Sequence, residues 1–389
     1  MKNKLAQIFA LHFFNDGFMA SIILLLPFIA KDLKLNLTQV GVLGSIISLS
    51  GILLSLPAGY LSHKFGTAKL LIVTIMFYGL GFLFTSLSQS YLFLIFSFFV
   101  TSISFGSFHP ISFSIVTRLS DKKHQGRVMG DFTATGEFGR ICLSGFLSFV
   151  AFSIGWRQTS MLYVVLAMLL LSAYLFFNFN NSEKNTDKNI KQKNPKQINF
   201  LEILKNKRFI LVLIISFFDL LASASLFIFL PFLLINKNIS PSILGAFTSA
   251  FFLGNFIGKM GLGRLTDKFK NTRVFIYAEL LMVLFIIFLT YSSSIFLIII
   301  FSIILGSLTM GTVPIRATML AETNAHHGVY EKSFAIDAVI SSLATALSAV
   351  ILGYVADHYG ITNAFNLCAL FAFIAIIPTY VLQLTNENL

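Results

Sequence analysis

The sequence predicts an all-α polytopic membrane protein in which twelve transmembrane helices form two pseudo-symmetric halves of six helices each. Composition is the first reason: 56% of the 389 residues are hydrophobic and 11% are charged, whereas a soluble domain carries about 25% charged residues. The second is that apolar runs of about 20 residues, long enough to cross a bilayer, recur throughout. An internal repeat is the third. No run alternates apolar and polar residues as the strands of a transmembrane β-barrel do.

Hydropathy places twelve apolar runs between short polar loops. One polar segment is long: residues 181–207 are rich in Asn, Lys and Gln and contain Pro195. Such a segment buries little apolar surface, so we expect a cytoplasmic linker between an N-terminal six-helix bundle (1–180) and a C-terminal one (208–389). Its end, 200–205, has apolar residues at the spacing of a membrane-surface helix. The predicted spans are 5–30, 39–61, 68–88, 91–117, 127–152, 159–180, 208–235, 242–265, 273–292, 294–320, 331–356 and 362–385.

A constant offset of 204 residues relates the two halves. Residues 59–69 (GYLSHKFGTAK) correspond to residues 263–273 (GRLTDKFKNTR), with Gly, Leu, Lys and Phe in register. One offset that holds along both halves indicates a duplicated unit, and two parallel six-helix halves are typical of one large class of transporters. The same offset aligns Pro27 with Pro231, Gly41 with Gly245, and Pro110 with Pro314.

The net charge of +12 follows the membrane topology. With the N-terminus in the cytoplasm, 21 of the 28 Lys and Arg residues fall on cytoplasmic segments, which is the positive-inside pattern. The charge therefore argues for cytoplasmic termini and against a nucleic-acid partner. Cys142 and Cys368 lie in apolar runs and are interpreted as buried thiols. The sequence has no Gly-rich ATP-binding loop and no His/Cys cluster at metal-ligand spacing, so we expect no cofactor and no metal.

The turn after the second span resembles the signature of the major facilitator superfamily, roughly G-x-L-x-D-R-x-G-R-R. In this turn Lys stands in for Arg, His63 stands at the acidic position, and Thr67 and Ala68 stand at basic ones. The second copy retains the acid as Asp267. The stretches H-F-F-N-D-G near the start and G-S-F-H-P in the fourth span resemble the fosmidomycin-resistance branch of drug exporters. The matching residues are Gly59, Leu61, Lys64, Gly66 and Lys69 in the first copy, with Gly263 and Lys268 as counterparts of Gly59 and Lys64.

This resemblance implies alternating access around a central site lined by the first, fourth, seventh and tenth spans. It also implies that the two repeated turns help to hold the inner gate closed. Because His63 replaces an acid, we expect a weaker first-half latch that responds to pH. Asp131, about one turn into the fifth span, is expected to lie near Lys64 or Lys69 as a gate latch.

Ionisable side chains inside spans mark candidate sites, because each costs roughly 2.5–3.5 kcal/mol to insert. His12 and Asp16 lie four residues apart, hence on one helix face, and Asn15 is beside them. The pair can exchange a proton near neutral pH; alternatively, Asp16 only bonds to a neighbouring helix. His109 precedes Pro110, which frees a backbone carbonyl in the fourth span.

The fifth span carries Glu137 and Arg140, three residues apart and therefore able to pair within one helix. Two interpretations remain open for this pair. It is either a neutral structural pair, or a pair that substrate or proton binding breaks.

The second half offers fewer ionisable candidates. Asp219 in the seventh span is the candidate for protonation there. Asn255 and Lys259 lie four residues apart in the eighth span, and Lys259 is interpreted as a snorkelling anchor near the inner end. Arg316 is either a site residue or a snorkelling one. Asp337 is expected to pair with Arg316 or to cap the inner gate.

Together these features predict a proton-coupled secondary transporter of the bacterial cytoplasmic membrane, acting as a monomer on a small organic solute. The resemblance favours export of a drug or metabolite in exchange for protons. The alternative is a transporter of an anionic metabolite, such as an organic acid or a carboxylate siderophore, by symport or export. A membrane-embedded enzyme or a receptor is a remote third reading, since no nucleophile or metal constellation stands out.

Overall fold

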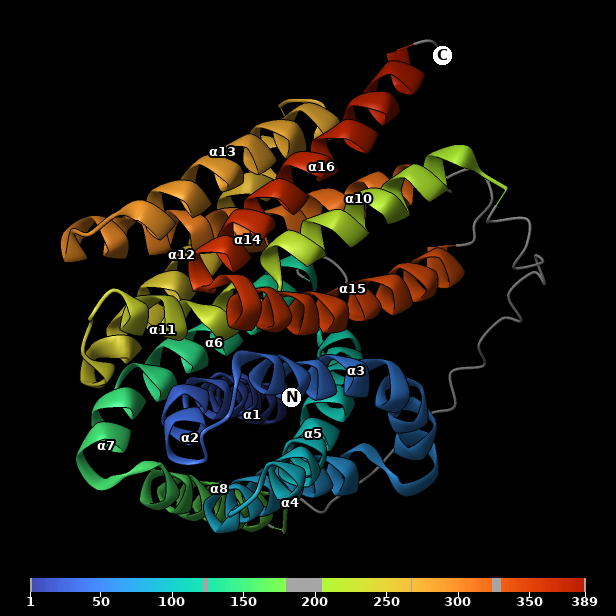
Figure 1. Cartoon of the computed structure of the whole chain (residues 1–389). Helices are drawn as coiled ribbons and strands as arrows, with labels where there is room; N and C mark the ends of the chain where they lie inside the picture. Colours follow the sequence, from blue (N-terminus) through green and yellow to red (C-terminus); the bar gives the residue numbers. More distant parts are fainter. Residues whose placement is uncertain (1, 122–124, 180–204, 267, 324–329, 388–389) are drawn as a thin grey trace.

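The computed structural model describes residues 2–121, 125–179, 205–266, 268–323 and 330–387. In these ranges all regular structure is helical, and each predicted span holds one helix or two consecutive helices, which confirms the fold class (Figure 1). The helices are α1 (Lys2–Leu24), α2 (Leu26–Asp32), α3 (Leu37–Phe65), α4 (Thr67–Leu87), α5 (Tyr91–Leu119), α6 (Gln125–Gly145), α7 (Leu147–Ile154), α8 (Trp156–Phe179), α10 (Lys207–Ser223), α11 (Leu226–Asn236), the short 3₁₀ helix η1 (Pro241–Ile243), α12 (Leu244–Leu265), α13 (Asn271–Tyr291), α14 (Ile295–Thr323), α15 (Tyr330–Tyr359) and α16 (Ile361–Glu387).

Local sequence explains where several helices begin and end. At the start of α3, the Asn36 side chain accepts a hydrogen bond from the Gln39 amide at 2.8 Å, and the Gln39 side chain accepts one from the Asn36 amide at 3.0 Å. This reciprocal cap satisfies two amides that a helix start leaves free. Gly66 joins α3 to α4 with φ +89°, a conformation that side-chain-bearing residues rarely adopt. Gly155 and Gly360 make equivalent turns.

Of the prolines related by the repeat offset, Pro27 alone lies at the start of a helix. Its missing N–H costs nothing there, and the first span is broken at this point into α1 and α2. The seventh span is also divided, into α10 and α11, but Pro231 lies inside α11. Pro110 and Pro314 lie inside α5 and α14, and both of those helices continue through them.

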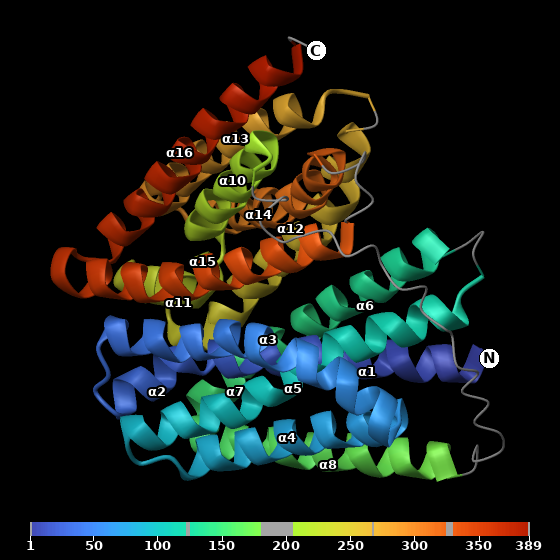
Figure 2. The same ribbon diagram turned by 90° about the vertical axis from the view of Figure 1, so that its right-hand side faces the viewer.

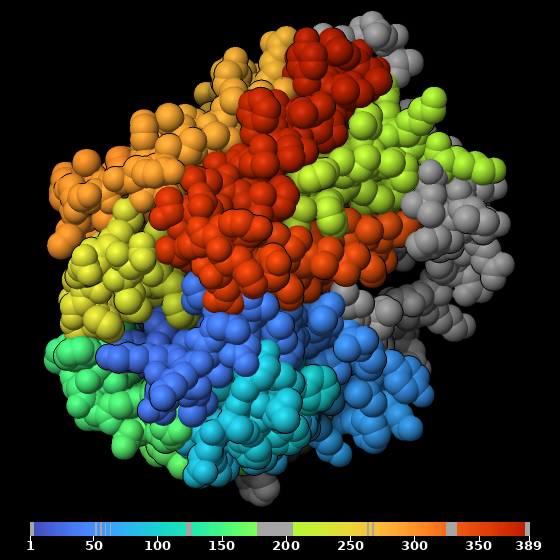
Figure 3. Space-filling model, viewed as in Figure 1, coloured from blue at the N-terminus to red at the C-terminus, as the bar shows by residue number. Residues whose placement is uncertain are grey.

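The helices α1–α8 gather on one side of the molecule and α10–α16 on the other (Figure 2). The two groups meet along two seams, α3 against α15 and α6 against α12. In the space-filling view α15 lies directly on α3 (Figure 3). The predicted linker, 181–207, falls mostly in residues 180–204, outside the described residues, as does nearly all of the predicted surface helix at 200–205. The domain division at the linker therefore stays a prediction.

Each seam contains a glycine whose backbone touches the opposite half. A Cβ on Gly41 of α3 would overlap the carbonyl oxygen of Ala349 on α15. A Cβ on Gly245 of α12 would overlap the carbonyl oxygen of Gly145 on α6. Gly41 and Gly245 are one of the pairs related by the repeat offset, so the two seams are built in the same way.

One acidic side chain ties the two groups of helices together at the start of α3. The carboxylate of Asp357, near the end of α15, accepts hydrogen bonds from the amides of Leu37 at 2.7 Å and Thr38 at 2.6 Å, and from the Thr38 hydroxyl. An anion at a helix N-terminus is stabilised by the free amides and by the helix dipole. We call this end of the molecule the closed end; it comprises the turns at residues 33–36, 88–90, 155, 237–240, 292–294 and 360.

The outer surface of the helices is apolar. Phe146, Leu92 and Phe296 are 78%, 76% and 71% exposed, as expected for side chains that face lipid rather than water. Among the described residues, eleven helical segments are long and apolar enough to cross a membrane, and Leu37–Ser50 of α3 is a further, shorter apolar segment. The protein is therefore a multi-pass membrane protein.

Candidate functional site

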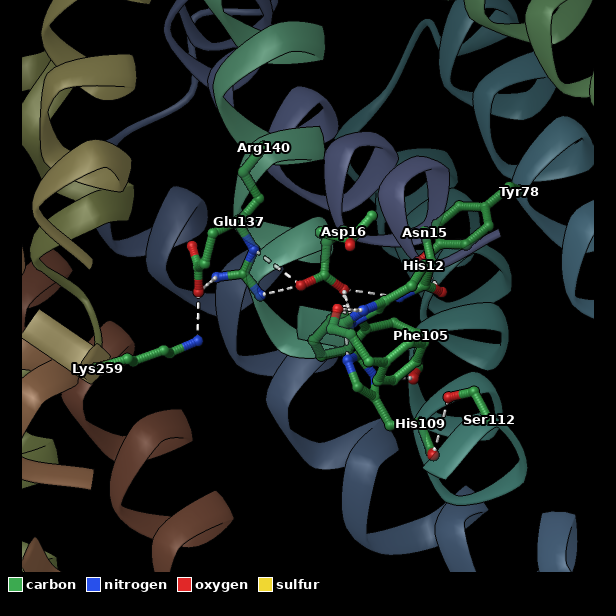
Figure 4. A network of polar contacts seen from close by, with 12 residues as sticks. His12, Asn15, Asp16, Tyr78, Phe105, His109, Ser112, Glu137, Arg140 and Lys259 are labelled. Atoms are coloured by element: carbon green, nitrogen blue, oxygen red, sulfur yellow. Dashed lines mark hydrogen bonds and ion pairs between the residues drawn. The ribbon is translucent and has the colours of Figure 1, made fainter. Parts of the chain in front are cut away.

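Asp16 on α1 is the centre of a buried polar network in the first half (Figure 4). Its side chain is 5% exposed, and its Oδ2 accepts hydrogen bonds from Nη2 of Arg140 at 2.8 Å and from Nε at 3.1 Å. Arg140 comes from α6, so this ion pair, in which two donors share one carboxylate oxygen, joins two helices. Two glycines on α6 permit the contact: a Cβ on Gly136 would overlap the imidazole of His12, and one on Gly139 would overlap the Phe13 backbone.

Two histidines face the other oxygen of Asp16. Nε2 of His12 lies 3.5 Å and Nε2 of His109 3.3 Å from Oδ1 of Asp16. The Nδ1 atoms of the same rings lie 2.7 Å from the Phe132 carbonyl oxygen and 3.3 Å from that of Phe105, respectively. Since a carbonyl only accepts, Nδ1 carries the hydrogen in both rings. Each Nε2 then bonds to the carboxylate only when its imidazole takes up a second proton.

Asn15 extends the network toward α4. Its Nδ2 donates to Oδ1 of Asp16 at 2.9 Å, and its own oxygen accepts from the Tyr78 hydroxyl at 3.0 Å. The fold thus brings together residues that the sequence singled out on three different spans: His12, Asn15 and Asp16 on the first, His109 on the fourth and Arg140 on the fifth. Tyr78 was not singled out, because a tyrosine in an apolar span gives no distinguishing signal.

The network continues across the interface between the halves. Oε1 of Glu137 accepts a hydrogen bond from Nζ of Lys259 on α12, and it lies 3.8 Å from Nη1 of Arg140. Glu137 is 1% exposed, and its Oε2 has no hydrogen-bond partner among the described residues. The predicted pair within α6, Glu137 with Arg140, is therefore a longer contact than the one that Arg140 makes with Asp16 or the one that Glu137 makes with Lys259. The interpretation of Lys259 as a snorkelling anchor is wrong, because its ammonium group points to Glu137.

A second buried cluster lies wholly in the second half. Nε of Arg316 on α14 lies 2.7 Å from Oδ2 of Asp219 on α10. The hydroxyl of Thr312, one turn away on α14, donates to the same carboxylate at 3.2 and 3.3 Å. Asp219 is fully buried and Arg316 is 7% exposed, so the snorkelling alternative for Arg316 does not hold. Arg316 pairs with Asp219, whereas Oδ1 of Asp337 has no partner among the described residues.

Glu279 on α13 completes this cluster and was missed by the sequence reasoning. Its side chain is fully buried, neither of its oxygens has a hydrogen-bond partner among the described residues, and its carboxyl group interacts with that of Asp219. The signal was available, because Glu279 is the one acidic residue of the ninth predicted span. Asn255 lies apart from both clusters; the hydroxyl of Thr309 contacts its oxygen at 3.5 Å, between α12 and α14.

The predicted gate residues are only partly described. Gly59 and His63 fall in α3 and Gly263 in α12, but the side chain of His63 is outside the description, and so is the whole of Asp267. Lys64, Asp131 and Lys268 are exposed. Within the described ranges no ion pair joins Asp131 to Lys64 or Lys69, so the expected latch contact is absent from this conformation.

Three side chains could in principle hold a metal ion: His12, Asp16 and His109 offer ligand atoms within 4.8 Å of one another. Sequence spacing predicted no metal site, and it could not reveal this grouping because the ligands come from two distant helices. The charges fit a proton better than a divalent cation, however. Arg140 already neutralises Asp16, so an added metal would bring uncompensated charge into a buried site.

The sequence matches the Major Facilitator Superfamily over residues 8–234 and again over residues 212–387. The chain belongs to this superfamily. It is therefore a membrane transporter of small solutes and not an enzyme. The double match agrees with the internal repeat, since each half resembles the same sequence family.

Individual relatives are distant. An uncharacterised MFS-type transporter of Methanocaldococcus jannaschii is 22% identical, with 94% of this chain and 93% of the relative covered. The probable nitrate transporter NarT of Staphylococcus epidermidis is 26% identical, with 72% of this chain and 71% of the relative covered. The inward-facing, unoccupied crystal structure of a bacterial homologue of the human lysosomal transporter Spinster has a TM-score of 0.81 at 14% identity, with coverage of 98% and 96%. That likeness concerns the fold.

Proposed function

We propose that this protein is a proton-coupled transporter of a small anion, which binds between Arg140 and Lys259. One observation carries the proposal: two cations from opposite halves converge on a single carboxylate, that of Glu137. The four charges of this chain of contacts, Asp16, Arg140, Glu137 and Lys259, balance in the absence of substrate. Glu137 thus occupies the place where the negative group of a substrate can bind.

Arg140 and Lys259 suit an anion for different reasons. The guanidinium of Arg140 donates to Asp16 through Nε and Nη2 and directs Nη1 toward Glu137, so Nη1 can donate to a carboxylate or another planar oxyanion. The Lys259 ammonium supplies a flexible point charge. Because both contact the same oxygen of Glu137, the gap between them accommodates a group of about carboxylate size. The nitrate transporter among the relatives supports an anion as the substrate class.

The position of Glu137 and Lys259 also suits alternating access. They link α6 of one half to α12 of the other, so rocking of the halves makes or breaks this contact. The seams at the closed end are tight, as Asp357 and Gly41 show. With both termini in the cytoplasm, as the positive-inside pattern predicts, the closed end is extracytoplasmic and the protein is inward-facing.

Proton coupling supplies the energy in this proposal. A monoanion that enters the cell moves against the inside-negative potential, at a cost of about 2.3 kcal/mol per 100 mV. One proton moving with it removes that cost. Buried ionisable groups in both halves give protons places to bind. The exchange of drugs for protons, predicted from the resemblance to the fosmidomycin-resistance branch, stays a prediction that the same assay tests.

Proteoliposomes containing a trapped pH dye test the proposal directly. An inward gradient of nitrate, formate or acetate, with no initial pH gradient, should acidify the lumen for at least one of these anions. Vesicles without protein give the baseline for passive entry of the protonated acids. No protein-dependent acidification with any small anion, together with proton movement driven by cationic drugs, would refute anion transport and favour the drug exporter.

Three variants test the binding site itself. Lys259→Gln removes one charged hydrogen-bond donor, worth about 1.5–3 kcal/mol, and should raise the KM for the anion roughly 10- to 150-fold. Glu137→Gln removes the internal competitor and should lower the KM. Lys207→Gln, at an exposed lysine where α10 begins, is the matched control and should leave the KM unchanged. Equal KM values in all three proteins would contradict the assignment.

A further inference from the structure

Glu279 carries a carboxyl group that takes no part in the proposed anion site. It is fully buried in α13, a helix outside the predicted lining of the central site. Neither of its oxygens has a hydrogen-bond donor among the described residues. A buried ionised carboxylate without donors costs several kcal/mol. The position therefore requires an explanation.

The neighbour of Glu279 supplies that explanation. Its carboxyl group lies close enough to the carboxyl group of Asp219 on α10 for the two to interact. Ionised carboxylates only accept hydrogen bonds, so two of them in contact form no bond with each other. A single proton changes this, since a protonated carboxyl donates to its ionised neighbour. Two carboxylates that share one site cannot both ionise without strong repulsion.

The surrounding charges are consistent with one bound proton. Arg316 from α14 makes the ion pair with Asp219, and Thr312 donates to the same carboxylate. Asp219 and Glu279 therefore share one arginine, and without a proton this buried pair would carry one uncompensated negative charge. The ion pair with Arg316 leaves Asp219 ionised and assigns the proton to Glu279.

We propose that Glu279 and Asp219 together form a proton-binding site in the second half, and that this site holds one proton in the present conformation. The proton sits on Glu279 and is donated to Asp219, whose remaining charge is balanced by Arg316. The site is separate from the Arg140–Lys259 anion site. Because Glu279 and Asp219 are inaccessible to solvent here, the proton enters and leaves in another conformation of the cycle.

The role of this proton in transport rests on the proposed function, but its presence does not. Loss of the proton would set two carboxylates in competition for Arg316 and loosen the contact between α10 and α14. Gain of a second proton, on Asp219, would release Arg316 from its partner. Either change alters the packing of the seventh and tenth spans, which gives proton binding a route to the central path.

Infrared spectroscopy detects the proton without reference to transport. A protonated carboxyl group has a C=O stretching band that ionised carboxylates lack and that shifts in D₂O. Glu279→Gln should remove one such band at pH 7. Asp219→Asn should remove it as well, since the introduced amide and Arg316 would give Glu279 the donors it lacks. Glu322→Gln is the control: Glu322 is exposed and hydrogen-bonded by Asn271, so the spectrum should not change. A band that persists in both cluster variants overturns the proposal.

Flux measurements then test coupling. Glu279→Gln keeps the shape of the side chain and mimics its protonated form. It should reduce proton-driven accumulation of the anion at least tenfold, while anion-for-anion exchange continues. If Asp16→Asn uncouples transport and Glu279→Gln does not, the coupling site is the His12–Asp16 pair and the role assigned to Glu279 in coupling is refuted. If the wild type moves no anion with protons, the proposed function fails, while the infrared bands still decide the proton site.

Discussion

The Asp357 contact at the closed end leads to the sharpest prediction about conformational balance. Asp357→Ala removes one acceptor group for three donors: two amides at the start of α3 and the Thr38 hydroxyl. The site is exposed, so each hydrogen bond is taken at about 0.5 kcal/mol, the low end of the usual range. The sum, about 1.5 kcal/mol, corresponds to a roughly tenfold shift toward the conformation that is open at this end.

Spin labels placed across the closed end measure this shift. Lys31→Cys on α2 and Tyr359→Cys on α15 are exposed positions in opposite halves, and labelling would follow replacement of the native Cys142 and Cys368. In the Asp357→Ala protein, electron–electron distance measurements should show a longer population about ten times larger than in the parent. Asp32→Asn is the matched control, because Asp32 binds Arg157 within the same half.

Two results would refute the reasoning about Asp357. One is an unchanged distance distribution in Asp357→Ala, which would mean that the cap contributes nothing to closure. The other is an equal shift in Asp32→Asn, which would mean that any loss of negative charge at this end opens it. The parent protein should give one dominant short distance, since the seams at this end are tight.

Three further predictions concern stability and gating. Gly139→Leu should lower unfolding stability by about 1–3 kcal/mol, because its side chain would overlap the Phe13 backbone; Gly130→Leu on the same helix, where a Cβ meets nothing, should not. Lys237→Met removes the ammonium that donates to the carbonyl oxygens of Thr290 and Ser292. It should lower the free energy of unfolding by about 1 kcal/mol per bond or less, which a lower melting temperature would show. His63→Asp should strengthen the first-half latch and reduce cytoplasmic labelling of a cysteine probe in the central path; unchanged labelling would contradict the latch.

Apolar run length and the repeat were enough to predict the fold, because a bilayer restricts the chain to helices of a set length. Among the described residues, each of the twelve predicted spans contains helix, and eleven of the segments are long and apolar enough to cross a membrane. Breaks within spans were not predicted: α6 ends at Gly145 and α7 begins at Leu147 without a proline to mark the division. Such breaks depend on how neighbouring helices pack, which a single sequence does not reveal.

The sequence predicted which residues belong to the candidate site, but it did not predict which of them contact one another. The cost of an ionisable group inside a span pointed to Asp16, Arg140 and Glu137, whatever their partners. Helical spacing, however, detects only contacts within one helix. It suggested a Glu137–Arg140 pair, whereas the shorter contacts run from Arg140 to α1 and from Glu137 to α12. Pairing across helices depends on their relative rotation, and no pattern in one chain encodes it plainly.

Gly41 and Gly245 lie at the seams between the halves, away from the central path of the solute, and they affect how closely the halves approach each other. At each seam the opposite backbone occupies the volume of a missing methyl group. A single alanine there would act as a wedge, tilting the halves apart while leaving the charges of the central path untouched. Natural variation at these two positions can therefore retune how long the transporter faces each compartment without altering what it carries. A compound that inserts between the two backbones at a seam would be an inhibitor with no resemblance to the substrate.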